Sequence, residues 1–461
     1  MTVYINDSSF SYDVYSLVKA FYPEEDIKVL EFSEGPDAFS FSIFEEVISV
    51  ADEGLERKDY KNKIKRAIYN YLSEKTGKVL PWGTLTGIRP TKLPMGMLYE
   101  NKSDEEIKAF LENIYYVTGE KIDLSLDIAK REKKLLDSID TENGYSLYVG
   151  IPFCPTTCMY CSFTSYPIAR WRNQVDEYIS MLKKEIDYVS ESQKGKTLDT
   201  IYIGGGTPTT LEPDQIRDLI SYIRDKLDLS QLKEFTVEAG RPDSITEDKL
   251  KALKEMDVTR ISVNPQTMND ETLRLIGRAH SVEQFRNAFN LARGYFDNIN
   301  TDLILGLPGE NDDMVKYTFD EIVKLSPDSV TVHAMAIKRA AHMKDFLTNN
   351  PHIKSEITDE MMRLLYDMAD SLNMKPYYLY RQKNMTGNYE NTGFSREGKE
   401  GIYNILIMEE VQSIIACGAG TITKRVFPGN RIERCDNVKD VKLYIEKIDE
   451  MIDRKRQLFK D

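Results

Sequence analysis

Six short apolar stretches alternate with amphipathic helical stretches over residues 144–335, and this alternation restricts the fold more than any other feature of the chain. The apolar stretches are 146–151, 200–203, 234–239, 260–264, 299–303 and 328–333. Nearly continuous apolar strands joined by helices are typical of a parallel sheet whose crossover helices cover its outer face. Six units are too few for a closed eight-stranded barrel, so we expect an α/β fold built on an open, partial (β/α)6 barrel.

Three of the five cysteines directly follow the first of these strands. Cys154, Cys158 and Cys161 have the spacing C-x3-C-x2-C within residues 152–162, which we call the cysteine loop. We expect a loop here because the two prolines of this segment disfavour both a continued strand and a helix. A disulfide framework needs cysteine pairs, and a structural zinc site needs a fourth nearby ligand, which the loop lacks. The spacing therefore predicts an iron–sulfur cluster with one iron open to a small chelating molecule, rather than three ordinary buried thiols.

Glycines or polar residues stand at the ends of the next four strands. The second strand runs into 204–207, Gly-Gly-Gly-Thr, where backbone amides can approach a ligand closely, although a tight turn also explains such a run. The following strands end at Glu238, at Asn264 and Gln266, and at Asp302. The carboxyl ends of parallel strands meet at one edge, and buried polar groups need partners, so these ends together predict one shared polar ligand. Taken singly, each is explained equally well by a structural hydrogen bond.

Length, charge and cysteine use limit the class of protein. The chain has 461 residues, which suggests two or three domains, and 41% of them are hydrophobic, enough for a large core. Its formal net charge of −14 argues against nucleic acid as the main partner. No run approaches about 18 apolar residues and the N-terminus has no signal-peptide pattern, so we expect a cytoplasmic protein without a membrane span. Cys417 and Cys435 are isolated, which suits a reducing compartment.

The order of these patterns predicts four parts. Residues 1–78 contain short strand patterns and a basic helix, and we expect a small N-terminal α+β domain. A helical connector at 79–143 precedes the partial barrel at 144–340, and an α-rich C-terminal extension at 341–461 is expected to cover the substrate. The basic helix carries lysines at positions 58, 61, 63 and 65, and these are interpreted as a solvated face, with contact to an acidic partner as the alternative.

Five motifs occur in order across residues 145–335. They are Ile-Pro-Phe with the cysteine spacing, Gly-Gly-Gly-Thr-Pro at 204–208, Thr-Val-Glu-Ala at 236–239, Ile-Gly-Arg-Ala-His at 276–280 and Asp-Leu-Ile-Leu-Gly-Leu-Pro-Gly at 302–309. In this order they resemble the radical S-adenosylmethionine (SAM) enzymes related to oxygen-independent coproporphyrinogen III oxidase. Segments 377–388 and 403–410 are similar to the HemZ branch of that family.

The resemblance implies a radical-SAM barrel and an oxidoreductase with two cofactors, a 4Fe–4S cluster and SAM. Cys154, Cys158 and Cys161 would then be the metal ligands of the cluster that cleaves SAM. By position, the residues that contact SAM would be Tyr148, Tyr160, Gly205, Gly206, Thr207, Glu238, Gln266, Arg278, Asp302 and Ala334. An electron donor such as flavodoxin or ferredoxin would reduce the cluster, and the 5′-deoxyadenosyl radical would take a hydrogen atom from the substrate.

The substrate that the resemblance implies is coproporphyrinogen III, whose propionates would become the vinyl groups of protoporphyrinogen IX in heme biosynthesis. This chain has Gly150 where the family usually has His, and Phe163 where the oxidases have a further Cys. It has Tyr403 where the heme-chaperone branch begins a His-Asn motif. A heme-binding chaperone or carrier, and radical modification or degradation of heme, are therefore the alternatives.

Two further groups of residues are interpreted as having no part in the chemistry. Arg381 and Lys383 are expected to be a solvated basic pair on a surface loop, with contact to tetrapyrrole propionates as the alternative. The histidines His280, His333, His342 and His352 are interpreted as structural or exposed residues, with metal ligation as the alternative.

Overall fold

The structure is a computed structural model, and it describes residues 1–23, 25–32, 38–335, 343–382 and 389–460. The chain divides into two compact units. The first unit consists of Met1–Arg131 and Leu379–Asn391, and the second of Glu132–Tyr378 and Thr392–Asp461. The division into four parts that the sequence suggests stays a prediction.

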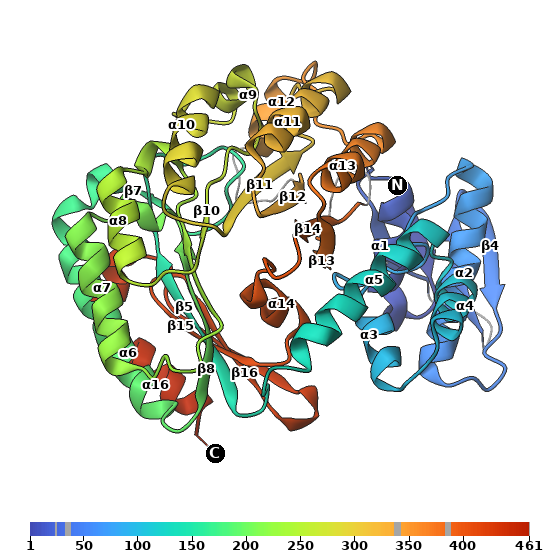
Figure 1. Cartoon of the computed structure of the whole chain (residues 1–461). Helices are drawn as coiled ribbons and strands as arrows, with labels where there is room; N and C mark the ends of the chain where they lie inside the picture. The colour runs from blue at the N-terminus through green and yellow to red at the C-terminus, as the bar shows by residue number, and fades with distance from the viewer. Residues whose placement is uncertain (24, 33–37, 336–342, 383–388, 461) are drawn as a thin grey trace. The chain divides into compact units, whose positions relative to one another are not determined.

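The first unit begins with a four-stranded sheet in the order β2-β1-β3-β4 (Figure 1). Its strands are β1 (Thr2–Ile5), β2 (Lys28–Glu31), β3 (Phe39–Ile43) and β4 (Glu46–Val50), and the helices of this part of the chain are α1 (Ser11–Phe21), α2 (Arg57–Thr76), α3 (Lys92–Tyr99), α4 (Asp104–Tyr115) and α5 (Gly119–Leu136). Alternate strand residues such as Val3, Phe39 and Phe41 share one buried core with Ile64 and Ile68 of α2. Burial of this apolar face stabilises the sheet against its helices.

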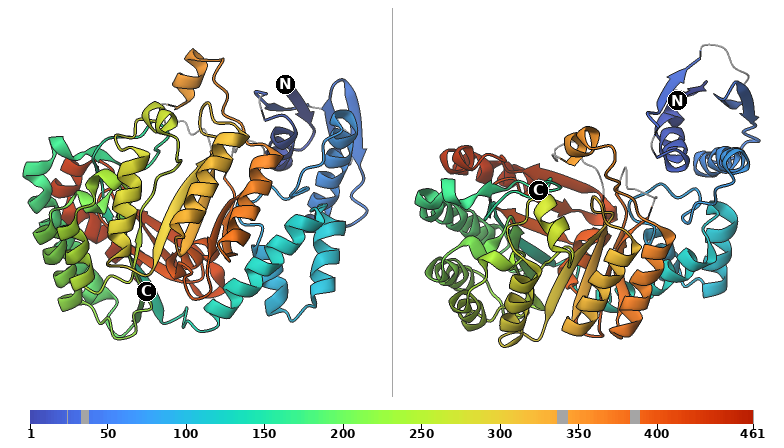
Figure 2. Two further views of the ribbon diagram at one scale, coloured as in Figure 1. Left: turned by 45° about the horizontal axis from the view of Figure 1, so that its top comes forward. Right: turned by 90° about the horizontal axis from the view of Figure 1, so that it is seen from above.

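The second unit is built around the six strands that the sequence predicts. They are β5 (Gly144–Ile151), β8 (Thr197–Gly205), β9 (Glu234–Glu238), β10 (Arg260–Ser262), β11 (Ile299–Leu305) and β12 (Ser329–Ala334). Each is parallel to the next. The crossover helices lie on the outer side of the curved sheet (Figures 1 and 2), and they are α6 (Val175–Ser192), α7 (Pro213–Lys226), α8 (Glu247–Glu255), α9 (Asp270–Leu275), α10 (Val282–Arg293) and α11 (Asp312–Leu325). The prediction of an open, partial α/β barrel is confirmed.

The C-terminal extension contributes strands as well as the expected helices. The whole sheet has the order β13-β14-β12-β11-β10-β9-β8-β5-β15-β16-β17. The added elements are β13 (Lys375–Tyr380), β14 (Asn391–Ser395), β15 (Ser413–Cys417), β16 (Ile422–Val426), β17 (Ile432–Asp436), α12 (Met343–Asn349), α13 (Asp359–Ser371), α14 (Ile402–Glu409), α15 (Val441–Glu446) and α16 (Ile448–Leu458). Strand β15 is parallel to β5, with Cys417 opposite Val149. The extension thus supports the strand that leads into the cysteine loop.

Helix α14 lies within the curve of the sheet and fills part of the barrel interior (Figure 1). The Tyr403 ring of α14 stacks on Tyr202 of β8 with ring centroids 4.5 Å apart, and on Tyr148 of β5 at 6.2 Å. The backbone N–H of Ile402 donates to the carboxylate of Glu234 at the start of β9. Stacked aromatic rings and an anchored first turn therefore hold this C-terminal helix in the interior.

Two residues expected to be solvated are buried in the first unit. Lys65 is 6% exposed, its Nζ donates to Thr86 Oγ1 at 3.1 Å, and burial lowers its pKa to about 8. Arg381 is 7% exposed and donates from Nη1 to the Leu85 carbonyl at 2.5 Å, with its guanidinium over the Trp82 ring. The interpretation of both as solvated residues is therefore wrong, because each has a polar or aromatic partner far away in the sequence. Lys383 lies outside the described residues.

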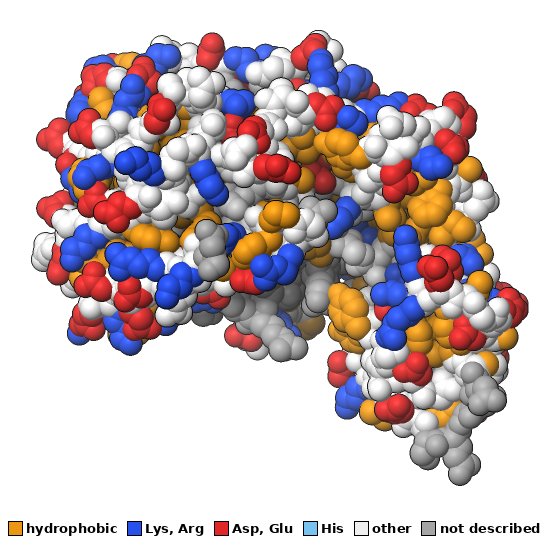
Figure 3. Space-filling model, turned by 90° about the horizontal axis from the view of Figure 1, so that it is seen from below, with side chains coloured by type: hydrophobic (Ala, Val, Ile, Leu, Met, Phe, Trp, Pro, Cys, Tyr) orange, Lys and Arg blue, Asp and Glu red, His pale blue; other side chains and the backbone are white. Residues whose placement is uncertain are grey.

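The molecular surface carries charges of both signs. On the face shown in Figure 3, acidic and basic side chains are interspersed and do not gather by sign. This face therefore presents a mixed charge to its surroundings. Among the described residues, no helix combines the length and the apolar character needed to cross a bilayer.

Candidate functional site

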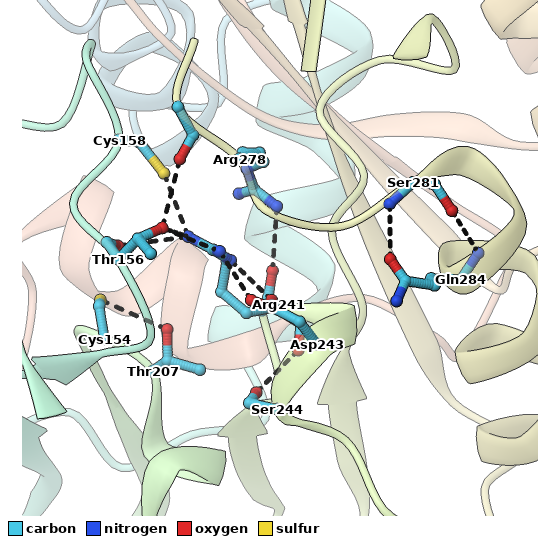
Figure 4. A network of polar contacts seen from close by, with 12 residues as sticks. Cys154, Thr156, Cys158, Thr207, Arg241, Asp243, Ser244, Arg278, Ser281 and Gln284 are labelled. Atoms are coloured by element: carbon cyan, nitrogen blue, oxygen red, sulfur yellow. Dashed lines mark hydrogen bonds and ion pairs between the residues drawn. The ribbon is translucent and has the colours of Figure 1, made fainter. Parts of the chain in front are cut away.

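The cysteine loop is attached to several strand ends by hydrogen bonds (Figure 4). Cys154, in the short strand β6 (Phe153–Cys154), has its Sγ 3.4 Å from Thr207 Oγ1 beyond the end of β8. Cys158 Sγ lies 3.5 Å from Nη1 of Arg241, beyond the end of β9. The N–H of Cys161 donates to the Cys158 carbonyl at 3.1 Å, which closes the turn that brings these two residues together. The predicted position of the loop, at the carboxyl ends of the strands, is thus observed.

Two contacts with the segment after α9 also fix the loop. The N–H of Met159 donates to the Ile276 carbonyl at 2.9 Å, and Thr156 Oγ1 donates to the Gly277 carbonyl at 3.2 Å. Burial raises the pKa of the Cys154 thiol to about 11. Because the thiolate is the metal-binding form, metal binding at this loop would release protons. Three such thiols on one fixed loop are a donor set suited to an iron–sulfur cluster.

The glycine run after β8 allows two backbones to approach closely. A side chain at Gly206 would place its Cβ only 2.6 Å from the Phe153 carbonyl oxygen, and Gly205 has φ +106°, in the region that favours glycine. The N–H groups of Gly206 and Thr207 donate to the carbonyls of Ile151 and Phe153, at 2.8 and 2.7 Å. The run is therefore required by the packing of β8 against the start of the cysteine loop.

The polar residues predicted at the strand ends include two separate hydrogen-bonded groups, Asn264 with Asp302 and Glu238 with Tyr202. Asn264 Nδ2 donates to Asp302 Oδ2 at 2.8 Å, and the Asp302 N–H donates to Asn264 Oδ1 at 3.0 Å. Tyr202 donates to Glu238 Oε1 at 2.6 Å, and burial raises the pKa of Glu238 to about 7 despite this hydrogen bond. Gln266 has φ +73°, and its buried Oε1 accepts no hydrogen bond from the described residues. An orphan buried acceptor is the feature expected where a ligand supplies the donor.

Arg278 connects Asn264 to the cysteine loop. It is buried, donates from Nη1 to the Asn264 carbonyl at 2.6 Å and from Nε to the Tyr160 hydroxyl at 3.2 Å. Ala334 ends β12 opposite Leu305 at the same edge of the sheet. The structure thus brings the predicted cysteines and the predicted polar residues to one end of the barrel.

The sequence reasoning missed two residues of this site, Arg241 and Asp243. Arg241 is 3% exposed and contacts Thr156 and Cys158 of the cysteine loop, and Asp243 binds its guanidinium (Figure 4). The signal available in the sequence was an Arg-Pro-Asp segment within a few residues of the end of a barrel strand. His280, interpreted as structural, is buried beside them and has no hydrogen-bond partner among the described residues.

Comparisons with known proteins agree with this geometry. Residues 148–322 match the radical SAM superfamily. The chain is 41% identical over 409 residues to HemZ of Bacillus subtilis, an oxygen-independent coproporphyrinogen-III oxidase-like protein, which covers 86% of this chain and 81% of that protein. It is 32% identical over 308 residues to the heme chaperone HemW of the same organism, over 66% of this chain and 76% of that one.

A solved structure shows the same fold. Coproporphyrinogen III oxidase (HemN) from Escherichia coli, described as a radical SAM enzyme, superposes with a TM-score of 0.53 and 23% identity over 69% of this chain and 73% of that chain. The fold and the cysteine loop thus define a radical SAM protein. More narrowly, the chain belongs to the family of radical SAM proteins that contains HemN, HemZ and HemW. This family uses a 4Fe–4S cluster and SAM, and the resemblance stated from the sequence is confirmed.

Proposed function

We propose that Cys154, Cys158 and Cys161 hold a 4Fe–4S cluster in a radical SAM enzyme. The observation that carries this proposal is the single fixed loop on which the three thiols lie, attached to residues beyond β8, β9 and α9. Three thiolates leave one iron of the cluster without a protein ligand, and SAM can chelate it there. When bound, the cluster supplies the electron that cleaves SAM and so begins radical chemistry.

The residues around the loop offer suitable groups for SAM. Within the described residues, Arg278 Nη2 donates no hydrogen bond, so it is available to pair with the methionyl carboxylate. The orphan Gln266 Oε1 can accept from a ribose hydroxyl, and ionised Glu238 can bind the methionyl ammonium. The proposed set also includes Tyr148, Tyr160, Gly205, Gly206, Thr207, Asp302 and Ala334.

The reaction we assign is oxidative decarboxylation of coproporphyrinogen III to protoporphyrinogen IX. Each of the two propionates that react loses a hydrogen atom to the SAM-derived radical, and carbon dioxide and one further electron leave to form the vinyl group. The support is membership of a family whose named members include coproporphyrinogen III oxidases. A low-potential electron donor such as flavodoxin or ferredoxin, in the cytoplasm, completes the proposed system.

A second candidate function is binding and delivery of heme. It is favoured by the 32% identity to a heme chaperone over 76% of that protein. In this case the tetrapyrrole would bind without chemical change. A third possibility within the same chemistry is radical modification of heme itself.

Iron content and SAM cleavage test the cluster assignment. The anaerobically purified protein should contain four irons per chain, and Cys154→Ala, Cys158→Ala and Cys161→Ala should each remove them, because a three-ligand site has no spare thiolate. Cys417→Ser is the matched control, since that thiol is buried in β15 and lies outside the cysteine loop. Retention of the cluster in all three loop variants would contradict the assignment.

Parallel anaerobic incubations, one with coproporphyrinogen III and one with heme, separate the candidate functions. With reductant and SAM, coproporphyrinogen III should give mono- and divinyl products, visible in mass spectra as successive losses of the elements of formic acid, and Cys158→Ala should give none. Unchanged coproporphyrinogen together with stoichiometric heme binding would establish the chaperone function instead. Alteration of heme alone would establish the third reaction.

A further inference from the structure

Arg241 is a buried cation in direct contact with the cysteine loop. Its Nη1 lies 3.5 Å from Cys158 Sγ, which stands for the thiolate of a metal-bound cysteine. Nη1 also donates to the Thr156 carbonyl at 3.3 Å and to Thr156 Oγ1 at 3.2 Å, and Nη2 donates to the same hydroxyl at 3.1 Å. One guanidinium thus binds the loop at two residues, Thr156 and the second cysteine, Cys158 (Figure 4).

Asp243 fixes the orientation of this guanidinium. Its two carboxylate oxygens accept from Arg241 Nε at 2.9 Å and from Nη2 at 2.8 Å, a two-point arrangement that holds the guanidinium plane. Burial alone would raise the pKa of Asp243, but the hydrogen bonds and charge of Arg241 outweigh it and keep the pKa below its usual range. The Nη1 atom is therefore directed at Cys158 by an ion pair on the far side of the arginine.

The backbone of Arg241 is also fixed by hydrogen bonds. The Arg241 carbonyl accepts from the N–H of Ser244 at 2.9 Å and from its hydroxyl at 2.7 Å. That hydroxyl is 2.6 Å from Thr209 Oγ1, in the turn that follows Thr207 and β8. Through Ser244 and Thr209 the arginine is thus connected to the same turn that carries the Thr207 contact with Cys154.

We infer that Arg241 raises the reduction potential of the cluster by donating a hydrogen bond to the Cys158 thiolate, an inference that rests on the proposed cluster ligation. A reduced cluster carries one more negative charge than an oxidised one, so a cationic donor at a ligand sulfur stabilises the reduced form. One electron from the low-potential donor enters the cluster in this step, and no bond forms or breaks. Arg241 is a positioning and tuning residue, since the iron is held by the three cysteines.

The pair Arg241 and Asp243 gives opposite predictions. Arg241→Gln removes the cationic donor, so at a fixed applied potential the ratio of reduced to oxidised cluster should fall about tenfold, a shift of about 59 mV to lower potential for one electron. Asp243→Asn keeps the donor and removes the compensating negative charge, so the potential should rise. Arg241→Lys keeps the positive charge, but an ammonium group cannot contact Thr156, Cys158 and Asp243 together as the planar guanidinium does. Its reduction potential should therefore lie between those of the wild type and Arg241→Gln.

The experiment is an EPR-monitored redox titration of the anaerobically purified full chain without SAM, with iron analysis of each sample. Arg217→Gln, which removes a partly exposed arginine paired with Asp214 and Glu255 on the outer helices, is the control and should leave the potential unchanged. Full iron content with a lowered potential in Arg241→Gln supports the inference, and full iron content with an unchanged potential overturns it. If Arg241→Gln does not fold, an unchanged potential in Asp243→Asn overturns it instead.

The result is separate from the test of cluster ligation. If the wild type contains no cluster, the ligation proposal fails, and this inference fails with it. If the wild type contains four irons and the variants do not move the potential, ligation stands and Arg241 has a purely structural role. Reduced iron content in Arg241→Gln, restored by Arg241→Lys at an unchanged potential, would likewise overturn the inference, because it would show that Arg241 only holds the loop in place.

Discussion

Two buried polar clusters in the second unit differ in how completely their groups are paired. Glu185 of α6 is fully buried, and four donors reach its carboxylate: the Gly418 N–H, Tyr444, Asn437 and Lys455, at 2.5 to 2.9 Å. In the barrel, by contrast, Gln266 Oε1 has no partner among the described residues. In the Glu185 cluster every hydrogen-bonding position of the carboxylate is used within the protein, so the cluster stabilises the packing of α15 and α16 and has no free group for a ligand. An unpaired buried acceptor such as Gln266 Oε1 lowers stability, and a ligand that donates to it can restore that stability.

The difference teaches how to separate structure from function among buried polar groups of one fold. Burial alone does not distinguish structural from functional polar groups. Glu185 and Lys455 have a structural role, yet they are the most deeply buried ion pair of the second unit among the described residues, with side chains 0% and 1% exposed. The number of unmet hydrogen bonds is the better indicator. Variants in each cluster can test this distinction.

The largest expected effect is on the saturated side. Glu185→Ala should lower the free energy of unfolding by about 3–5 kcal/mol, because it leaves the charged Lys455 in the interior without its counter-ion. Urea unfolding measures this, and iron content per folded chain should not change. Glu191→Ala, an exposed residue of the same helix, is the control. A loss below about 1 kcal/mol would mean that the four hydrogen bonds do not act together.

The next effect is on the orphaned side. Gln266→Leu should weaken SAM binding about two- to twelvefold, since the lost acceptor is worth roughly 0.5–1.5 kcal/mol, while the unfolding free energy stays the same or rises. Calorimetric titration of SAM into the anaerobic protein gives the affinity. A variant that loses stability without losing affinity would place Gln266 with the structural residues.

A smaller effect concerns pH. The buried Glu238 has its pKa raised to about 7, against about 4.3 when unfolded, so folding favours its protonated form. Its contribution to stability is therefore complete below about pH 4 and is lost as the pH rises through 7. Glu238→Gln should flatten the decline in urea midpoint between pH 5 and pH 8. Identical declines in variant and wild type would show that other groups cause it.

The smallest effect is expected at Cys435, in β17. Its thiol is outside both clusters and partly exposed, so Cys435→Ser should change stability by no more than about 0.5 kcal/mol. Iron content and SAM cleavage should equal those of the wild type. A drop in iron would mean that a fourth cysteine takes part in cluster assembly.

The barrel could be predicted because its signals are local. Each central strand is an apolar run, and the rule that the carboxyl ends of parallel strands share one edge places Glu238 and Asp302 together without knowledge of any contact. The hairpin of β3 and β4 could not be predicted, because its turn uses Phe44 and Glu45 at φ 53° and 66°, where glycine or asparagine is the usual signal.

Contacts between distant residues set the limit of prediction in the site. The sequence shows that Arg241 is charged, but only the folded chain shows that it turns inward to Cys158, 83 residues earlier. Arg381 was interpreted wrongly for the same reason, since its acceptor on Leu85 is 296 residues away. Charged residues are exposed by default, and the exceptions depend on partners that no local pattern identifies.

Strand β15 follows its partner β5 far along the chain, and this separation affects folding during synthesis. Ser146 of β5 donates to Gln412, beside β15, across 266 residues of chain. A ribosome adding about 5–20 residues per second needs roughly 13 to 53 s to span that distance. Until then one side of β5 lacks its permanent neighbour, and distant parallel pairing is slow to form. The cysteine loop therefore gains its full support only after β15 has been synthesised and has paired with β5.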